Sequence, residues 1–143
     1  MAEENSKLMA HEIMFASAER AAGTFTSNIV TSYTTKGGIF YLDITAENAG
    51  STTTLDVKLQ GLDQISGDWF DLADNVVGTG AYAFAQASAV TTGPTVLAVY
   101  PGLTASGNAV CTGILPAVFR AHATVAGSST PTMTFSLGVD LIK

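Results

Sequence analysis

Large apolar residues alternate with polar ones along two neighbouring stretches within residues 38–63. Successive side chains of an extended strand point to opposite faces, so this period of two predicts two β-strands with one apolar face each. The apolar positions are Phe40, Leu42, Ile44, Leu55, Val57 and Leu59. A glycine-containing turn joins the strands, and we expect them to pair as a hairpin whose apolar face is covered by a second layer.

The same alternation returns twice near the C-terminus. The apolar positions are Phe119, Ala121, Ala123 and Val125 in residues 115–125, and Met133, Phe135, Leu137, Val139 and Leu141 in residues 132–141. Both stretches predict amphipathic strands. Pro116 suits the start of a strand, where a missing backbone N–H does no harm.

Shorter elements complete the pattern. Residues 24–33 are rich in Thr, Ile and Val and predict a strand, whereas residues 13–20 are compatible with either strand or helix. The Ser-Gly-Asp sequence at residues 66–68 predicts a turn, after which residues 69–72 return on the preceding strand. Residues 95–100 predict a core strand that a Pro-Gly pair ends.

About eight or nine short strands without a convincing helix predict an all-β fold, namely an antiparallel β-sandwich of jelly-roll or Ig-like type. The chain has 143 residues, which is room for one domain with a core of its own. We assign residues 13–143 to this domain and the polar residues 1–12 to an N-terminal arm. The arm is expected to fray, or alternatively to order against another subunit.

Charged residues make up only 13% of the chain, against roughly 25% in a typical soluble domain. The net charge is -6, with six scattered Lys and Arg residues, which argues against nucleic acid or an anionic membrane as partner. No apolar stretch is long enough for a membrane span, and an acidic start is unlike a secretion signal. We expect a soluble, unexported chain with a neutral, hydroxyl-rich surface.

Residues that support catalysis are scarce. The histidines are His11 and His122, the one cysteine is Cys111, and no nucleophile elbow, zinc-protease motif or paired-cysteine spacing occurs. We therefore expect no enzyme activity and no cofactor. We interpret His122 as a surface or interface residue rather than a metal ligand, and Cys111 as a small buried apolar residue.

Two binding functions, for calcium and for carbohydrate, are considered as alternatives. Five aspartates follow one another closely: Asp56, Asp63, Asp68, Asp71 and Asp74. Their oxygens suit calcium, although the spacing matches no EF-hand and turns favour aspartate in any case. Five aromatic residues could instead form a sugar-stacking platform, as in a carbohydrate-binding β-sandwich, or serve as core and cross-strand pairs. These are Tyr41, Trp69, Phe70, Tyr82 and Tyr100.

Six segments carry a resemblance to a known family. They are FASAER, IFYLDITA, TLDVKLQGLDQISGDWFDL, LAVYPGLTA, LPAVFRAHATV and TFSLGVDLI, and they fall within residues 15–142. Together they resemble small virion proteins of tailed bacteriophages, in particular capsid decoration, or cement, proteins and related head-associated proteins. The most distinctive parts are YPGLTA and the pattern QGxDxxSGxWxDL.

The resemblance implies an all-β structural protein that binds the outer surface of the phage head and stabilises the shell. The implied partner is the major capsid protein, the implied assembly is a homo-oligomer, expected to be a trimer, and the implied location is the virion, assembled in the host cytoplasm. A tail or neck component of the virion is the alternative. The residues expected to contact a partner are Lys7, Leu8, Met9, Trp69 and Pro101.

Overall fold

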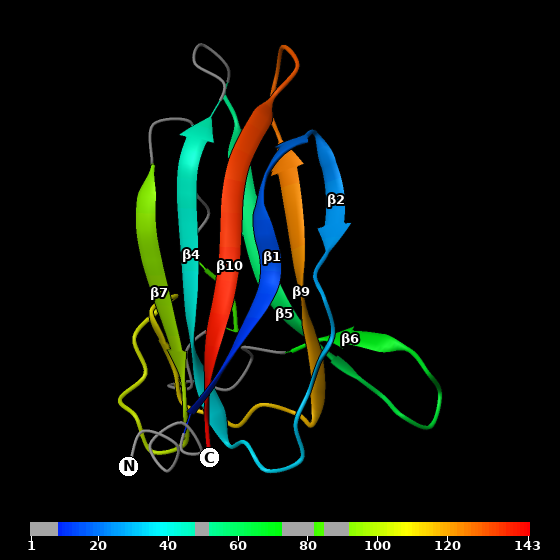
Figure 1. Ribbon diagram of the computed structural model, residues 1–143, viewed down its shortest axis with the longest axis vertical. Helices are drawn as coiled ribbons and strands as arrows, with labels where there is room; N and C mark the ends of the chain where they lie inside the picture. Colours follow the sequence, from blue (N-terminus) through cyan, green and yellow to red (C-terminus); the bar gives the residue numbers. More distant parts are fainter. Residues whose placement is uncertain (1–8, 48–51, 73–81, 85–91) are drawn as a thin grey trace.

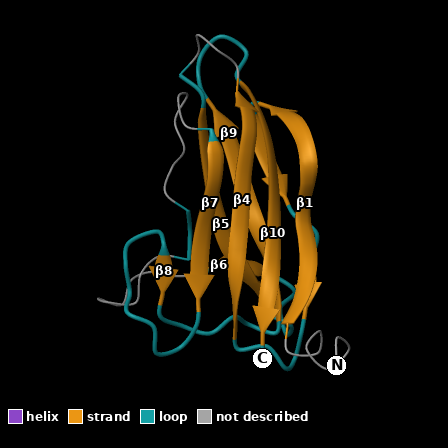
Figure 2. Ribbon diagram, turned by 60° about the vertical axis from the view of Figure 1, so that its left-hand side comes forward, coloured by secondary structure: helices purple, strands orange, loops and turns teal. Residues whose placement is uncertain are grey.

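The computed structural model describes residues 9–47, 52–72, 82–84 and 92–143, and in that part of the chain it has ten β-strands and no helix. Sheet A has the order β1 (Met9–Ala21), β10 (Thr132–Ile142), β4 (Gly37–Glu47), β7 (Gly93–Val99) and β8 (Val110–Cys111). Sheet B has the order β2 (Gly23–Thr26), β9 (Val118–Ala126), β5 (Thr54–Leu62) and β6 (Trp69–Asp71), and β3 (Val30–Thr31) also pairs with β9. The sheets lie face to face (Figure 1 and Figure 2), which confirms the predicted all-β sandwich.

The core lies between the two sheets. Every apolar position predicted from the alternation is buried there. The rings of Phe40 in β4 and Phe119 in β9 meet edge to face with their centroids 6.0 Å apart, so this pair joins sheet A to sheet B. Because side chains of both sheets interdigitate in this way, neither sheet is stable without the other.

The predicted hairpin between the two central strands is wrong. β4 pairs with β10 and β7 in sheet A, whereas β5 pairs with β9 and β6 in sheet B. The two strands therefore belong to opposite layers and share no ladder of hydrogen bonds. An alternating pattern states which face of a strand is buried, and both arrangements bury the same residues, so the pattern could not separate them.

The stretch at residues 13–20, which is compatible with strand or helix, lies within the long edge strand β1. Its pairing with β10 shifts register between Ile13 and Phe15 and again between Phe15 and Ala18. Such bulges allow two consecutive side chains, Met14 and Phe15, to enter the core. The bulges explain why this strand lacks the simple alternation of the others.

Several shorter predictions are confirmed. Gly67 adopts a φ of 81° in the predicted turn, and the residues after it form β6, which returns on the end of β5. The predicted core strand at residues 95–100 is β7. The strand predicted at residues 24–33 is divided into β2 and β3, because Ser27 pairs with Ala121 through both its backbone and its hydroxyl. The short β8, which runs parallel to β7, was not predicted.

The two ends of the sandwich differ. At the far end the chain passes from one sheet to the other after β1, β4 and β9. At the opposite end, which we call the terminal end, lie the start of β1, the end of β10 and the described loops at residues 32–36, 100–109 and 112–117, and the loop at residues 63–68 projects sideways from sheet B near this end (Figure 1). β1 begins at Met9, so four residues of the predicted arm pair with β10.

Candidate interaction surfaces

Each of the four described loops at or beside the terminal end exposes one large apolar side chain. These side chains are Tyr33, Ile65, Leu103 and Ile114, and their exposed fractions run from 40% for Leu103 to 98% for Ile65. Apolar surface in water is unfavourable, and contact with a second surface removes it from water. We group these four residues as candidate docking positions and name them together the loop surface.

Two of these loops are tied to one another by backbone hydrogen bonds. The N–H of Ser32 donates to the carbonyl of Ala117 at 2.8 Å, and the N–H of Leu115 donates to the carbonyl of Lys36 at 2.9 Å. These bonds connect the loop before β4 with the loop before β9. A loop that is already ordered loses little conformational entropy when it binds a partner.

The loop at residues 63–68 is ordered by an aspartate. The Asp63 carboxylate accepts hydrogen bonds from the N–H of Ile65 at 2.9 Å and from the hydroxyl of Ser66 at 3.0 Å. The bond from Ile65, followed by that from Ser66, lowers the pKa of Asp63, so the carboxylate is charged at neutral pH. This arrangement holds Ile65 at the tip of the projecting β5–β6 ribbon.

The loop at residues 112–117 is shaped around Tyr82. The tyrosine hydroxyl donates to the carbonyl of Ile114 at 3.2 Å. A Cβ atom on Gly113 would lie 2.0 Å from the same hydroxyl, so only glycine fits there. Burial, followed by the nearby Cys111, raises the pKa of Tyr82 to about 12. Cys111 is itself fully buried, as predicted.

The structure describes three of the five predicted contact residues, and they lie on three different elements. Met9 begins β1 opposite Ile142, Trp69 begins β6 at the end of the β5–β6 ribbon, and Pro101 is exposed in the loop after β7. Lys7 and Leu8 lie outside the described residues.

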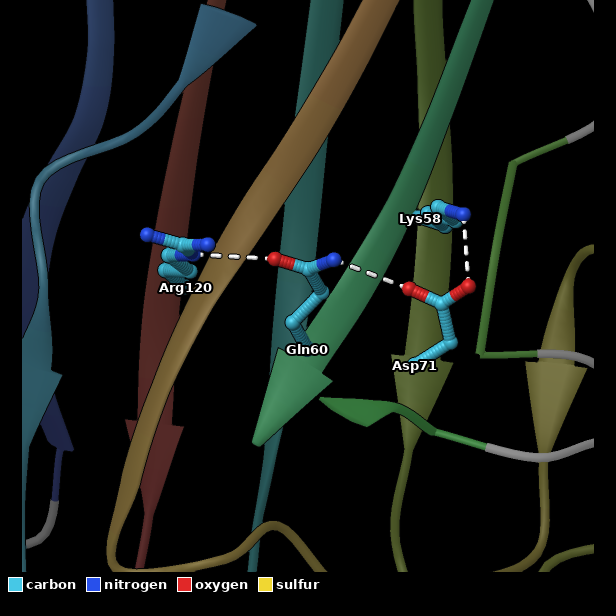
Figure 3. Close-up of polar contacts among 4 residues, drawn as sticks. All are labelled: Lys58, Gln60, Asp71 and Arg120. Atoms are coloured by element: carbon cyan, nitrogen blue, oxygen red, sulfur yellow. Dashed lines mark hydrogen bonds and ion pairs between the residues drawn. The ribbon is translucent and has the colours of Figure 1, made fainter. Parts of the chain in front are cut away.

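Trp69 belongs to a polar cluster on the outer face of sheet B. The Arg120 guanidinium lies over the Trp69 ring, 4.1 Å from its centroid, and its Nε donates to Gln60 Oε1 at 2.9 Å. Gln60 Nε2 donates to Asp71 Oδ1 at 2.9 Å, and Lys58 Nζ donates to Asp71 Oδ2 at 2.6 Å (Figure 3). The cluster thereby links β9, β5 and β6.

Neighbouring groups shift the pKa values of two side chains in and beside this cluster, Asp71 and His122. Hydrogen bonds from Lys58, and then from Gln60, lower the pKa of Asp71. Burial, and then the charge of Lys58, lower the pKa of His122, so this imidazole is neutral at pH 7. The side chains satisfy one another and stabilise the pairing of three strands.

The aromatic residues weighed as a sugar platform are spread over the molecule. One face of the Trp69 ring is covered by Arg120 on sheet B, whereas Tyr41 lies on the outer face of sheet A. Tyr82 is half-buried against the core. The described residues therefore offer a sugar no continuous stack of rings.

No three histidine, cysteine, aspartate or glutamate side chains of the described residues form a group that could hold a metal ion. Asp63 and Asp71 are each engaged in the contacts given above, and Asp74 lies outside the described residues. The two histidines lie in different sheets, His11 in β1 and His122 in β9. The calcium hypothesis thus gains no site from the described part of the chain.

The outer face of sheet A, which we call the A face, is apolar in its centre. A hollow of about 400 Å³ lies over Ser136 and Gly138 and is bordered by Ile13 and Tyr41, and the His11 ring covers one side of Gly138, 3.2 Å from where a Cβ atom of that residue would be. Beside it, His11 Nδ1 and Asp140 Oδ1 lie 2.7 Å apart. A hydrogen bond with Asp140 is the main cause that raises the pKa of Tyr41.

Sequence reasoning missed both the loop surface and the A face. Ile65 is an isolated apolar residue within a polar turn sequence, and this signal could have marked it as exposed. Tyr33, Leu103 and Ile114 carry no such signal, because only the tertiary fold brings their loops to one end.

Comparison with known proteins identifies no family. No family model matches the chain, and no curated protein matches it. One solved structure, described as that of infectious bursal disease virus Gx strain, is similar at 14% sequence identity with a TM-score of 0.36. The match covers 94% of this chain and 32% of that chain. At that TM-score we draw no conclusion from the likeness.

The described residues include no helix that is long and apolar enough to span a membrane.

Proposed function

We propose that this protein is a structural component of a virus particle, and more specifically a capsid decoration protein that binds the outer surface of a phage head through its terminal end. The observation that carries the proposal is the loop surface, where four loops at or beside the terminal end each present one exposed apolar side chain. The sequence resemblance to head decoration proteins over residues 15–142 supports the same role.

The chemistry of the loop surface suits attachment to a shell. Shallow apolar contacts on several loops fit a protein surface without the need to desolvate charges, which is the costly part of many interfaces. A protein that binds only the mature lattice stabilises that lattice by mass action. The major capsid protein is therefore the proposed partner, and Met9, Trp69 and Pro101 would border the contact.

The ionisable side chains support a binding role rather than a catalytic one. Lys58 and Asp71 hold strands together, Asp63 orders a turn, and His11 pairs with Asp140. Each of these groups is used in a local contact of the fold.

Binding to purified heads tests the proposal. Heads that lack the protein are incubated with the wild type or with a double variant, Ile65→Ser with Leu103→Ser, and occupancy is measured by sedimentation and gel densitometry. We expect the wild type to bind in hundreds of copies per head and the double variant to lose at least about tenfold in affinity, which is about 1.4 kcal/mol.

Ile29→Ser is the matched control, because Ile29 is 57% exposed but lies between β2 and β3, outside the four loops. This variant should bind like the wild type. The proposal fails if wild-type protein ignores intact heads, or if the double variant binds as well as Ile29→Ser. Occupancy of only a few copies per particle would favour the tail or neck alternative.

A further inference from the structure

The A face carries a row of four residues that are direct neighbours across four strands. Ile13 of β1 is opposite Gly138 of β10, Gly138 is opposite Tyr41 of β4, and Tyr41 is opposite Val96 of β7. Ile13, Tyr41 and Val96 are 60%, 40% and 46% exposed. Three large, partly exposed apolar side chains thus share one row across strands that lie side by side (Figure 2), and exposed apolar surface of this kind marks protein contacts.

The row can pack against the same row of a second copy when that copy presents it in the opposite order. Large apolar residues stand at both ends, and in the middle the hollow over Ser136 and Gly138 adjoins Tyr41, which is 40% exposed and whose hydroxyl is hydrogen-bonded to Asp140 of the same copy. Consider a second copy that is related to the first by a two-fold axis parallel to the strands, placed between the two A faces and midway between β10 and β4. Gly138 then lies opposite Tyr41 of the second copy. In the same arrangement Ile13 lies opposite Val96 of the copy. Each contact is made twice, as in an isologous interface.

The charges of the A face permit such stacking although the chain carries a net charge of -6. Asp140 is hydrogen-bonded to His11 of its own copy and is opposite Ile39 in the register of β10 and β4, so the axis places it opposite Ile39 of the second copy and not opposite another carboxylate. Asp43 is opposite Ser136 in the register of β4 and β10, so the same axis places Asp43 opposite Ser136 of the copy, where a hydroxyl can donate to the carboxylate. Like charges therefore do not face each other.

The area of the face is large enough for a stable contact. β10 spans eleven residues and the row crosses four strands. At about 3.3 Å per residue and about 4.8 Å between strands, the face projects an area on the order of 700 Å². A stable interface buries roughly 800 Å² on each partner. Stacking along the whole face therefore buries an area in this range. The buried surface area is larger than the projected area, because side chains project from the face.

The edge of sheet A next to this face is closed to a second copy. Along β1, Arg20 donates to the carbonyls of Ala16 and Ala18, and Asn28 donates to the carbonyls of Ile13 and Met14. Backbone groups that are already bonded cannot template another strand. At the β1 side of sheet A, a second copy therefore finds the face more accessible than the edge.

We propose that two copies of this chain stack through their A faces as an isologous dimer, in which Tyr41 of each copy fills the hollow over Gly138 of the other. The partner of this surface is thus a second copy, and the dimer exists without a phage head. It replaces the trimer expected from the resemblance with an assembly of two-fold symmetry.

Sedimentation of the purified protein tests the assembly. We expect a concentration-dependent dimer for the wild type and a dimer Kd at least about tenfold higher for Tyr41→Asp and for Ile13→Asp. Ile29→Asp, an exposed apolar position off the A face, should dimerise like the wild type, and circular dichroism checks that each variant is folded. A wild type that stays monomeric or forms a trimer overturns the proposal, as do A-face variants that dimerise normally.

Cysteine cross-linking tests the geometry. Ile13→Cys mixed with Val96→Cys should form a covalent dimer when copper phenanthroline oxidises the two thiols to a disulfide, whereas either variant alone should cross-link poorly. Cys111 is fully buried and does not compete. Efficient cross-linking of Ile13→Cys with itself would contradict the axis. Both experiments use protein without heads, so their outcome is separate from that of the capsid-binding test.

Discussion

At the scale of single residues, Arg20 closes the open side of the sandwich beside β1. Its guanidinium lies 4.4 Å from the centroid of the Phe135 ring and 5.0 Å from that of Phe15. It donates hydrogen bonds to the carbonyls of Ala16, Ala18 and Phe135 at 2.9 to 3.0 Å. Burial lowers the pKa of Arg20, but a guanidinium stays charged at any physiological pH. One side chain thus covers two core rings and occupies backbone carbonyls of the edge strand β1 that could otherwise pair with another strand.

Arg20→Ala should lower the free energy of unfolding by about 2 kcal/mol, because it removes charge-assisted hydrogen bonds and two cation–π contacts. Arg20→Lys should lose about half as much, since an ammonium lacks the planar fork that reaches several carbonyls. Urea unfolding followed by fluorescence measures both values. Lys36→Ala, at an exposed cation, should stay within about 0.5 kcal/mol of the wild type. A loss for Arg20→Ala no larger than that of Lys36→Ala would refute this role.

At the scale of elements, strands that are consecutive in the chain lie in opposite sheets more often than they pair within one sheet. One member lies in sheet A and the other in sheet B in pairs such as β1 and β2, β4 and β5, and β9 and β10. The apolar faces of both members then meet in the core. The alternation of Phe40, Leu42 and Ile44 was sufficient to predict burial, whereas the partner of β4 depends on β10, which lies about a hundred residues away in the chain.

A double-mutant cycle on Phe40 and Phe119 tests the facing of the sheets. Phe40→Leu and Phe119→Leu should each cost about 1 to 2 kcal/mol in stability, with a coupling energy of about 0.5 to 1.5 kcal/mol because the rings touch. Thermal and urea unfolding provide the values. Phe70→Leu, at a ring that is 56% exposed, serves as the control and should change stability little. Strictly additive losses at Phe40 and Phe119 would mean that the two rings do not meet.

At the scale of the whole molecule, the two proposed surfaces are compatible. The loop surface lies at or beside one end of the strands, and the A face runs along their length. A two-fold axis parallel to the strands leaves both copies pointing in the same direction. The dimer therefore presents two loop surfaces on one side, and two linked attachment points bind a shell with greater avidity than one.

Tyr41→Asp should accordingly weaken binding to heads about tenfold to a hundredfold, although it leaves the docking loops unchanged, because a monomer has a single attachment point. Occupancy on purified heads at several protein concentrations measures the effect. The covalent dimer of Ile13→Cys with Val96→Cys should bind like the wild type. If Tyr41→Asp binds heads with unchanged affinity, the dimer plays no part in attachment, whatever its stability in solution.

The sequence by itself determined the all-β class, the buried face of each long strand and the turn at residues 66–68, because these depend on side-chain alternation and on the backbone preferences of neighbouring residues. Only the tertiary structure decided which strands pair, that β4 and β5 lie in opposite sheets, and that Tyr33, Ile65, Leu103 and Ile114 are exposed on loops at or beside one end. It also decided that Ile13, Gly138, Tyr41 and Val96 form one row. The reason is physical: a pattern with a period of two residues is local, whereas pairing and surface neighbours arise from contacts between segments far apart in the chain.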